Sequence, residues 1–289
     1  MLEVGTLGLF GKGQNLSAHA TRVVAENNPD SLAIATKRAP GADHYGSLAS
    51  ALQYVKSDVT LSVSTSLLVA VNLTGLGDND VALLARFIVD QFSCCCVRFF
   101  LWAQLHSEGR VEKVTALFSA SGLTCRQFAL KPSTWSPFSE HLAVWTNLVV
   151  DIFSGDPGFV WASLKLFEPV LRLRLPAASD CVVAPWRLDG DDLEYWARSS
   201  AFGFSYPPGA AGPPCISSLS SGGVAPRFLW PSEAERMLGW EADLSACIPK
   251  VEGQTLQDRR KRRLQCLLSA PSSQVLAFAA LALCPGPRG

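Results

Sequence analysis

The chain contains 289 residues, of which 48% are hydrophobic and 17% are charged, so it has enough apolar material for a folded core of one large or two modest domains. Lys plus Arg and Asp plus Glu number 25 each, and this net charge of zero excludes a global attraction to nucleic acid or to anionic membranes. No apolar run reaches the roughly 18 residues of a membrane span, and the first residues lack the features of a secretory signal. We therefore expect an intracellular protein, nuclear or cytoplasmic, that does not enter a membrane.

The cysteines predict neither a disulfide framework nor a metal site. Their number, 9, is odd, and no two have the C-x-x-C spacing of zinc ligands. Cys94, Cys95 and Cys96 are consecutive, and neighbouring residues of a strand point to opposite faces, so one site cannot readily collect all three. We expect no metal ion and a reducing compartment.

The first half of the chain alternates apolar strand candidates with helical segments. Strands are expected at 4–10, 23–26, 59–63 and 96–102, and helices at 17–21, 31–38, 47–56, 80–92 and 110–120. Two further strands, 125–130 and 142–148, are expected to pair with each other. This alternation predicts one doubly wound α/β domain over 1–150, with a mainly parallel sheet and helices on both faces.

The second half of the chain changes in composition. Residues 151–226 predict a small irregular module, which ends in a flexible loop at 207–226 that is rich in Pro, Gly and Ser. Residues 227–289 contain expected helices at 231–238, 258–268 and 271–283, and we expect these C-terminal helices to pack back on the main domain.

A glycine turn after the first expected strand and an acidic residue at the end of the second are typical of a nucleoside site. Gly11 and Gly13 would bring backbone close to the ligand, and the Glu26 carboxylate would bind ribose hydroxyls. The third small residue of the dinucleotide fingerprint is replaced by Leu16, which disfavours a nicotinamide cofactor. The alternative interpretation is an ordinary strand turn followed by an exposed carboxylate.

Several segments together, in their order along the chain, resemble the cytosine-C5 DNA methyltransferase family. They are residues 7–13 (LGLFGKG), 24–33, 44–48, 58–62, 72–78, 135–137, 144–148 and 230–240 (WPSEAERMLGW). The resemblance implies a Rossmann-like, S-adenosylmethionine-dependent methyltransferase fold. It also implies an irregular module that faces DNA and catalytic domains that pair, so that the partners would be DNA, bound weakly, and a second protein or a second copy of the chain.

The same resemblance assigns roles to individual residues. It implies that the cofactor is contacted by Leu9, Phe10, Gly11, Gly13 and Glu26. The family attacks the base with a cysteine thiolate, and counting from Asp58 puts Ser66 at that position, after Thr65 in place of a proline. Trp102 stands where the family has the glutamate that holds the base.

Further departures affect the remaining polar positions of the family. They are Glu140 and Leu142 at the arginine pair, Ser47 at the acid of the third motif, and Ser269 and Ala270 at the final Gly-Asn. A serine ionises far less readily than a thiol and needs a neighbouring base to act as a nucleophile. The pattern predicts a pseudoenzyme, because the apolar periodicity of the fold is retained while the polar residues at the family's catalytic and binding positions are replaced.

A cluster of five basic residues near the end of the chain predicts a local nucleic-acid contact or a nuclear signal. The cluster consists of Arg259, Arg260, Lys261, Arg262 and Arg263. The alternative is a solvated helix face.

The sequence therefore favours a divergent cytosine-C5 DNA methyltransferase-like domain without methyl transfer, which has a regulatory or interaction role. Two alternatives stay open. One is an active S-adenosylmethionine-dependent DNA methyltransferase whose motifs are shifted near Ser66, and the other is a nucleotide-binding α/β scaffold unrelated to DNA.

Overall fold

The computed structural model of the protein describes residues 1–8, 21–57, 66–104, 108–130, 142–147, 231–237, 240–241 and 243–269. The described residues form two compact units, one containing those up to 147 and the other those from 231 onward. The predicted domain boundaries at 150 and 226, the irregular module and the packing of the C-terminal helices stay predictions.

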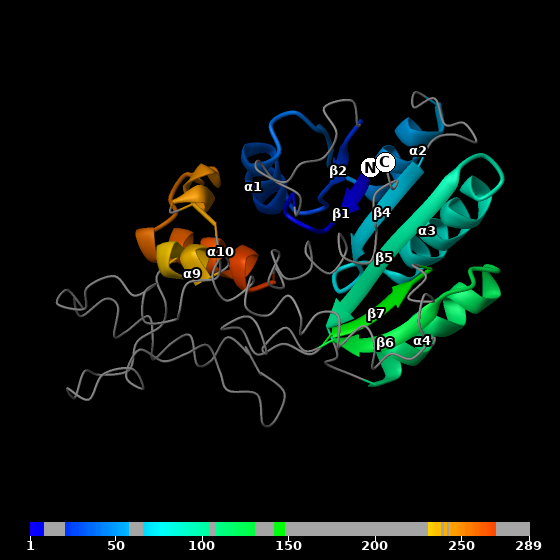
Figure 1. The fold of residues 1–289 in the computed structure, drawn as a ribbon. Helices are drawn as coiled ribbons and strands as arrows, with labels where there is room; N and C mark the ends of the chain where they lie inside the picture. Colours follow the sequence, from blue (N-terminus) through cyan, green and yellow to red (C-terminus); the bar gives the residue numbers. More distant parts are fainter. Residues whose placement is uncertain are drawn as a thin grey trace, which may run out of the picture. The chain divides into compact units, whose positions relative to one another are not determined.

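The first unit is built around a seven-stranded sheet with the order β3-β2-β1-β4-β5-β7-β6 (Figure 1). The strands are β1 (Leu2–Val4), β2 (Val23–Ala25), β3 (Asp43–Tyr45), β4 (Ser66–Asn72), β5 (Cys96–Gln104), β6 (Arg126–Leu130) and β7 (Leu142–Thr146). Neighbouring strands from β3 to β5 run parallel, whereas β7 is antiparallel to both β5 and β6. The predicted mainly parallel sheet and the predicted pairing of the two last strands are confirmed.

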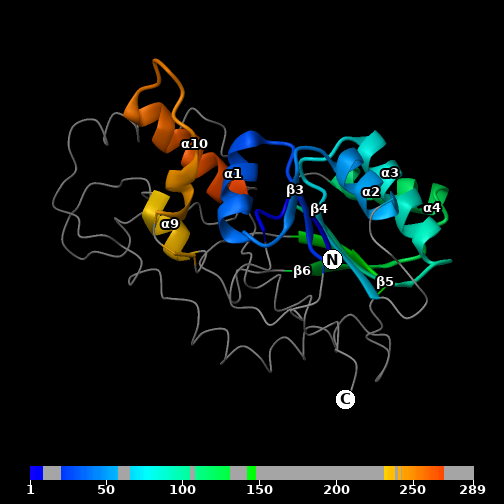
Figure 2. The same ribbon diagram turned by 90° about the horizontal axis from the view of Figure 1, so that it is seen from above.

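Helices cover both faces of this sheet, as predicted (Figure 2). They are α1 (Pro29–Arg38), α2 (Leu48–Ser57), α3 (Asp78–Gln91) and α4 (Glu108–Ala120). The larger core joins one face of the sheet to apolar side chains of α2, α3 and α4, whereas α1 packs on Val24 of the opposite face through Ala35 and Ala39. Strands buried on both faces explain the continuous apolar runs of the sequence.

Local sequence signals account for the ends of these helices. The Asn28 side chain accepts the Asp30 N–H and caps α1, whose first residue is Pro29. Ser47, at the expected acidic position of the third motif, accepts the Ser50 N–H at 3.2 Å and so caps the first turn of α2. Gly122 has φ +76° and ends α4, as predicted.

Two strands differ from the expected ranges. β1 is Leu2–Val4 rather than 4–10, because the chain turns at residues 5–8. The fourth strand is Ser66–Asn72, where it pairs with both β1 and β5, and the expected strand at 59–63 lies outside the described residues. Pairing with β1 and β5 thus defines a strand that begins at Ser66, beyond the expected range.

The second unit contains α9 (Pro231–Met237), the short 3-10 helix η4 (Leu244–Cys247) and α10 (Leu256–Ser269). The helices α9 and α10 correspond to the expected ranges 231–238 and 258–268. The expected helices at 17–21 and 271–283 fall on residues that are not, or barely, described.

Candidate functional site

The turn after β1 lies at the carboxyl ends of β1 and β4, where the strand order reverses and α/β folds bind their ligands. Gly5, Leu7 and Gly8 all have positive φ values, of 62°, 52° and 66°. A Cβ on Gly5 would lie 3.1 Å from the carbonyl oxygen of Asn72, and one on Gly8 would lie 3.3 Å from that of Ala35. Glycine is therefore needed at both positions for conformation and for space.

Glu26 follows β2 directly and faces this turn. Its Oε1 accepts the N–H of Leu7 at 2.6 Å, and its own N–H donates to the carbonyl oxygen of Tyr45 at 3.0 Å. Only 4% of the Glu26 residue is exposed. The alternative interpretation of Glu26 as an exposed carboxylate is therefore wrong, whereas its ribose-binding role stays a prediction.

Burial changes the ionisation of Glu26. Desolvation raises the pKa of its carboxyl from the usual value to about 7, and the backbone hydrogen bonds from Leu7 and Thr6 partly oppose this rise. The nearby charge of Glu3 raises the pKa further, and that of Arg38 lowers it. The group therefore changes charge near neutral pH.

A second buried carboxylate supports the same turn from β1. Glu3 is fully buried and accepts hydrogen bonds from the Thr6 hydroxyl at 3.0 Å and from Arg22 Nε at 2.6 Å. Arg38, the last residue of α1, donates from Nη1 to the carbonyl oxygen of Leu7 at 2.7 Å. Sequence reasoning missed Glu3, Arg22 and Arg38, because their partners are distant in the chain and a basic residue that ends a helix is common.

The other predicted cofactor residues cannot be placed beside Glu26. Leu9, Phe10, Gly11 and Gly13 lie outside the described residues, and their cofactor role stays a prediction. The glycine turn that directly follows β1 is formed by residues 5–8, earlier in the chain than the expected Gly11 and Gly13.

The loop after β4, Leu73–Gly77, joins that strand to α3 and is bonded to β5. The N–H of Leu73 donates to the carbonyl oxygen of Trp102 at 2.7 Å, and the Thr74 hydroxyl accepts the N–H of Gln104 at 3.1 Å. The loop has the ordinary length of a βα connection.

The far end of the same loop is held by α4. Arg110 donates from Nη2 to the carbonyl oxygen of Leu76 at 2.6 Å and forms an ion pair with Asp78, the first residue of α3. The whole connection is thus tied to its neighbours along its length.

The two predicted catalytic positions lie at opposite ends of the neighbouring strands β4 and β5. Ser66 begins β4 and pairs with Cys96, whereas Trp102 pairs with Asn72 near the carboxyl ends of both strands. At about 3.3 Å per residue, this register separates them by roughly 20 Å. The structure therefore does not bring Ser66 and Trp102 together, because the fourth strand begins at Ser66 instead of ending before it.

Trp102 is part of the packed interior. It is 1% exposed, and its ring lies 5.7 Å from that of Phe100. Its indole Nε1 is buried and has no hydrogen-bond partner within the described part of the chain. An indole N–H can donate but cannot accept, so Trp102 cannot replace a carboxylate.

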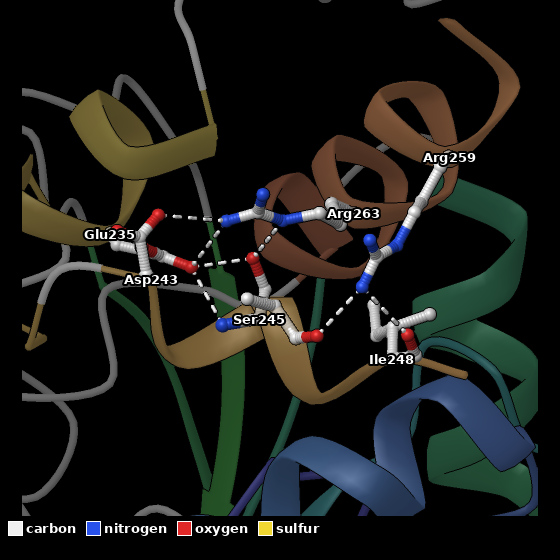
Figure 3. A network of polar contacts seen from close by, with 7 residues as sticks. Glu235, Asp243, Ser245, Ile248, Arg259 and Arg263 are labelled. Carbon is white, nitrogen blue, oxygen red and sulfur yellow. Dashed lines mark hydrogen bonds and ion pairs between the residues drawn. The ribbon is translucent and has the colours of Figure 1, made fainter. Parts of the chain in front are cut away.

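The predicted DNA-contacting run lies on α10, and its arginines contact the chain's own residues (Figure 3). Arg263 donates from Nε to the Ser245 hydroxyl at 2.7 Å, and its Nη2 lies 3.4 Å from Glu235 and 3.5 Å from Asp243. Glu235 is fully buried and accepts both the N–H and the hydroxyl of Ser245.

Two further arginines of the run bind backbone carbonyls next to η4. Arg259 donates from Nη2 to Ala246 at 2.8 Å and to Ile248 at 3.3 Å, and Arg262 donates from Nη1 to Pro249 at 3.2 Å. Arg259, Arg262 and Arg263 thus connect α10 to the preceding segment, so the alternative of a solvated helix face does not describe these three residues. Arg260 and Lys261 belong to the same helix, and a DNA contact by the run stays a prediction.

No described cysteine lies at the carboxyl edge of the parallel strands. Cys94 and Cys96 are exposed and Cys95 is buried at the start of β5, Cys125 precedes β6, and Cys247 and Cys266 belong to the second unit. Among the described residues, no group of His, Cys, Asp and Glu side chains could hold a metal ion. In the same part of the chain, none of the helices has the length and apolarity needed to cross a membrane.

The strand order and the antiparallel β7 define a methyltransferase-like Rossmann fold, which confirms the predicted fold class. No protein-family model and no curated protein sequence matches the chain. Solved structures of methyltransferases do match it.

Three of these structures cover nearly the whole chain. The S. pombe Dnmt2 methyltransferase has a TM-score of 0.58 and 11% identity, and the match covers 96% of this chain and 95% of that one. A putative DNA modification methyltransferase encoded within an E. coli prophage has a TM-score of 0.53, 12% identity and coverage of 98% and 97%. The Entamoeba histolytica methyltransferase EhMeth has a TM-score of 0.55, 12% identity and coverage of 98% and 96%. At this identity the likeness concerns the fold.

Proposed function

We propose that the protein is a divergent cytosine-C5 DNA methyltransferase-like domain that has lost methyl transfer and acts as a regulatory or interaction module. The observation that carries this proposal is the loop after β4. In the family that the sequence resembles, the catalytic thiolate belongs to the loop that follows this strand. Here Leu73–Gly77 contains no cysteine and leads directly into α3.

Among the described residues near that loop, none offers a replacement for the thiolate. The hydroxyl of Thr74 accepts a backbone N–H from β5, and a threonine needs an adjacent general base to become a nucleophile. At the carboxyl end of β5, the position of the base-holding glutamate is occupied by the buried indole of Trp102. The alternative of an active enzyme with shifted motifs gains no support, since the observed position of β4 brings no thiol to this edge among the described residues.

S-adenosylmethionine is the cofactor that the proposed family implies, and the described residues fit it in part. Glu26 is beside the turn after β1, where a carboxylate would accept hydrogen bonds from ribose hydroxyls, and Leu9, Phe10, Gly11 and Gly13 are the proposed backbone contacts. One Glu26 oxygen already accepts the Leu7 N–H, but a carboxylate has about four acceptor sites. We expect binding in the micromolar to millimolar range or none, depending on Glu26.

DNA is the proposed nucleic-acid partner, and its binding is expected to be weak. Three arginines of the basic run are hydrogen-bonded within the second unit, which limits the groups that can neutralise phosphates. We expect a dissociation constant no better than about micromolar at physiological salt. A protein partner or a second copy of the chain, and a nuclear location, complete the proposal.

A nucleoside-binding scaffold unrelated to DNA is the second candidate. It is supported by one observation, namely that Glu26 is hydrogen-bonded to the turn after β1 while Ser66 and Trp102 lie apart. Calorimetric titration with S-adenosylhomocysteine, adenosine triphosphate and a DNA duplex separates the two candidates. Binding of adenosine triphosphate alone would support the scaffold.

The main experiment measures methyl transfer from tritiated S-adenosylmethionine to duplex DNA. We expect no incorporation above background, while an active cytosine-C5 DNA methyltransferase labels the same DNA in parallel. Incorporation by the purified wild type, retained after removal of contaminating enzymes, would contradict the loss of activity. Weakened S-adenosylhomocysteine binding in Glu26→Gln would support the position of the pocket.

A further inference from the structure

The backbone of Leu7 is held on both sides, by an acidic residue at its N–H and by a basic residue at its carbonyl oxygen. Its N–H donates to Glu26 at 2.6 Å, and its carbonyl oxygen accepts from Arg38 at 2.7 Å. The acid follows β2 and the arginine ends α1, so two separate elements hold one residue of the turn after β1.

Leu7 needs such support because of its backbone conformation. Its φ of 52° is in the left-handed region, where a side chain with a Cβ is strained. The leucine side chain is buried, so the residue contributes packing that glycine would not. Hydrogen bonds from charged groups are stronger than neutral ones and can maintain a strained backbone.

We infer that Arg38 is a positioning residue of the nucleoside site, which acts with Glu26 to fix the backbone of Leu7 in its left-handed conformation and thereby shapes the turn that a ligand would contact. The inference rests on the proposed nucleoside-binding role of the turn. Its ligand class is a nucleoside or nucleotide whose 2′ and 3′ ribose hydroxyls are free, because a phosphate at either of these positions would meet the Glu26 carboxylate.

The close packing of α1 on the turn after β1 explains how the side chain of Arg38 can bind the backbone of the turn. A Cβ on Gly8 would lie 3.5 Å from the Arg38 Cβ, so the end of α1 and the turn are close together. From this position the guanidinium of Arg38 reaches the carbonyl oxygen of Leu7. Glu3 on β1 and Arg22, which precedes β2, form an ion pair at 2.6 Å, and Glu3 also accepts the hydroxyl of Thr6 in the same turn.

The first test needs no ligand. The amide signal of Leu7 in nuclear magnetic resonance spectra should follow the ionisation of Glu26, since the two are hydrogen-bonded. We expect Arg38→Met to reduce the amplitude of this pH response to less than half, and Lys37→Met, at the neighbouring exposed position, to leave it unchanged. If Arg38 acted only through its charge, the midpoint would rise and the amplitude would persist, which would overturn the inference.

The second test uses S-adenosylhomocysteine in calorimetric titrations. We expect Arg38→Met to weaken binding about tenfold, which corresponds to loss of one charge-assisted hydrogen bond, while Lys37→Met binds as the wild type does. Absence of binding by the wild type would mean that the cofactor is no longer bound, an outcome that the proposed function includes, and the amide response would then decide the role of Arg38. If Arg38→Met did not fold, a scalar coupling across the hydrogen bond from Arg38 to the Leu7 carbonyl carbon in the wild type would support the inference, and its absence would overturn it.

Discussion

Ser66 pairs with Cys96 at the amino end of β4, and Trp102 pairs with Asn72 at the other end of the same two strands. The residues that stand at the expected nucleophile and acid positions are therefore separated by most of the sheet. Ligands of α/β folds bind at the carboxyl edge, so only Trp102 lies at the edge where chemistry is expected.

This separation predicts that a thiol at position 66 creates no activity. We expect Ser66→Cys to form no covalent adduct with a 5-fluorocytosine duplex, because the thiol would lie roughly 20 Å along the strand from the carboxyl edge. Denaturing electrophoresis of the protein with labelled duplex measures the adduct. Thr74→Cys, in the loop after β4, is the matched variant, and we expect it to be inactive too, because catalytic groups act as a unit. Trapping by Ser66→Cys would contradict the observed register.

The pKa of Glu26, raised to about 7 mainly by burial, predicts how stability depends on pH. The folded protein favours the neutral carboxyl, so this stabilisation is complete below the usual pKa of a glutamate and is lost as the pH rises through about 7. Glu26→Gln keeps a neutral group that can accept the Leu7 N–H. We expect it to be more stable than the wild type at pH 8, by at most about 3 kcal/mol, and nearly equal at pH 4. Urea unfolding at both values tests this, and an equal difference at both would contradict it.

The contacts of Arg263 predict that the basic run stabilises the second unit. Arg263 is 16% exposed and its partner Glu235 is fully buried, so removal of the guanidinium leaves a buried carboxylate without its ion pair. We expect Arg263→Met to destabilise residues 231–269 by about 2 to 4 kcal/mol. Hydrogen exchange of peptides from this range measures the effect. Lys261→Met, on the same helix, is the control, and an equal loss of protection in both variants would contradict a specific role of Arg263.

Trp102 and Trp145 are both buried and lie on neighbouring strands, but they differ in whether the indole N–H has a hydrogen-bond partner among the described residues. Trp145 donates from Nε1 to the Thr115 hydroxyl at 3.0 Å, whereas the Nε1 of Trp102 has no partner among the described residues. Replacement by phenylalanine removes a hydrogen bond at position 145 and a buried unpaired donor at position 102. We expect Trp145→Phe to cost about 1 kcal/mol more than Trp102→Phe in urea unfolding. A larger loss in Trp102→Phe would mean that its indole N–H is bonded.

Much of the fold could be predicted from periodicity and end signals. The helix from Asp78 to Gln91 and the strand from Cys96 to Gln104 are long enough for their apolar patterns to be unambiguous. The position of β4 was not predictable, because the apolar stretch before Asn72 fits a strand at two places and only its partners decide. For the same reason, Ser66 was expected in the loop after this strand, whereas it is the first residue of β4.

Residues of the candidate site were predictable only where the residue type and its position in the sequence together indicate a ligand contact. Glu26 could be found because an acid at the end of a second strand has a known use. Arg38 could not, since its partner is the backbone of Leu7, which has no side-chain signature, and the two are brought together only by the packing of α1. Likewise, the sequence of the basic run is typical of a surface cluster, and its hydrogen bonds to backbone carbonyls in and after η4 could not be predicted from it.

The hydrogen bonds that hold the connection from β4 to α3 set a limit on what point mutations in it can achieve. A segment that is bonded to β5 at Thr74 and to α4 at Leu76 has no spare chain to extend over a bound base. Lengthening a surface connection costs little chain entropy, so an inserted loop is the change that this scaffold could accept. If the proposed absence of methyl transfer is correct, engineering that activity into this scaffold would therefore have to begin with an insertion after Asn72, before any single residue could matter.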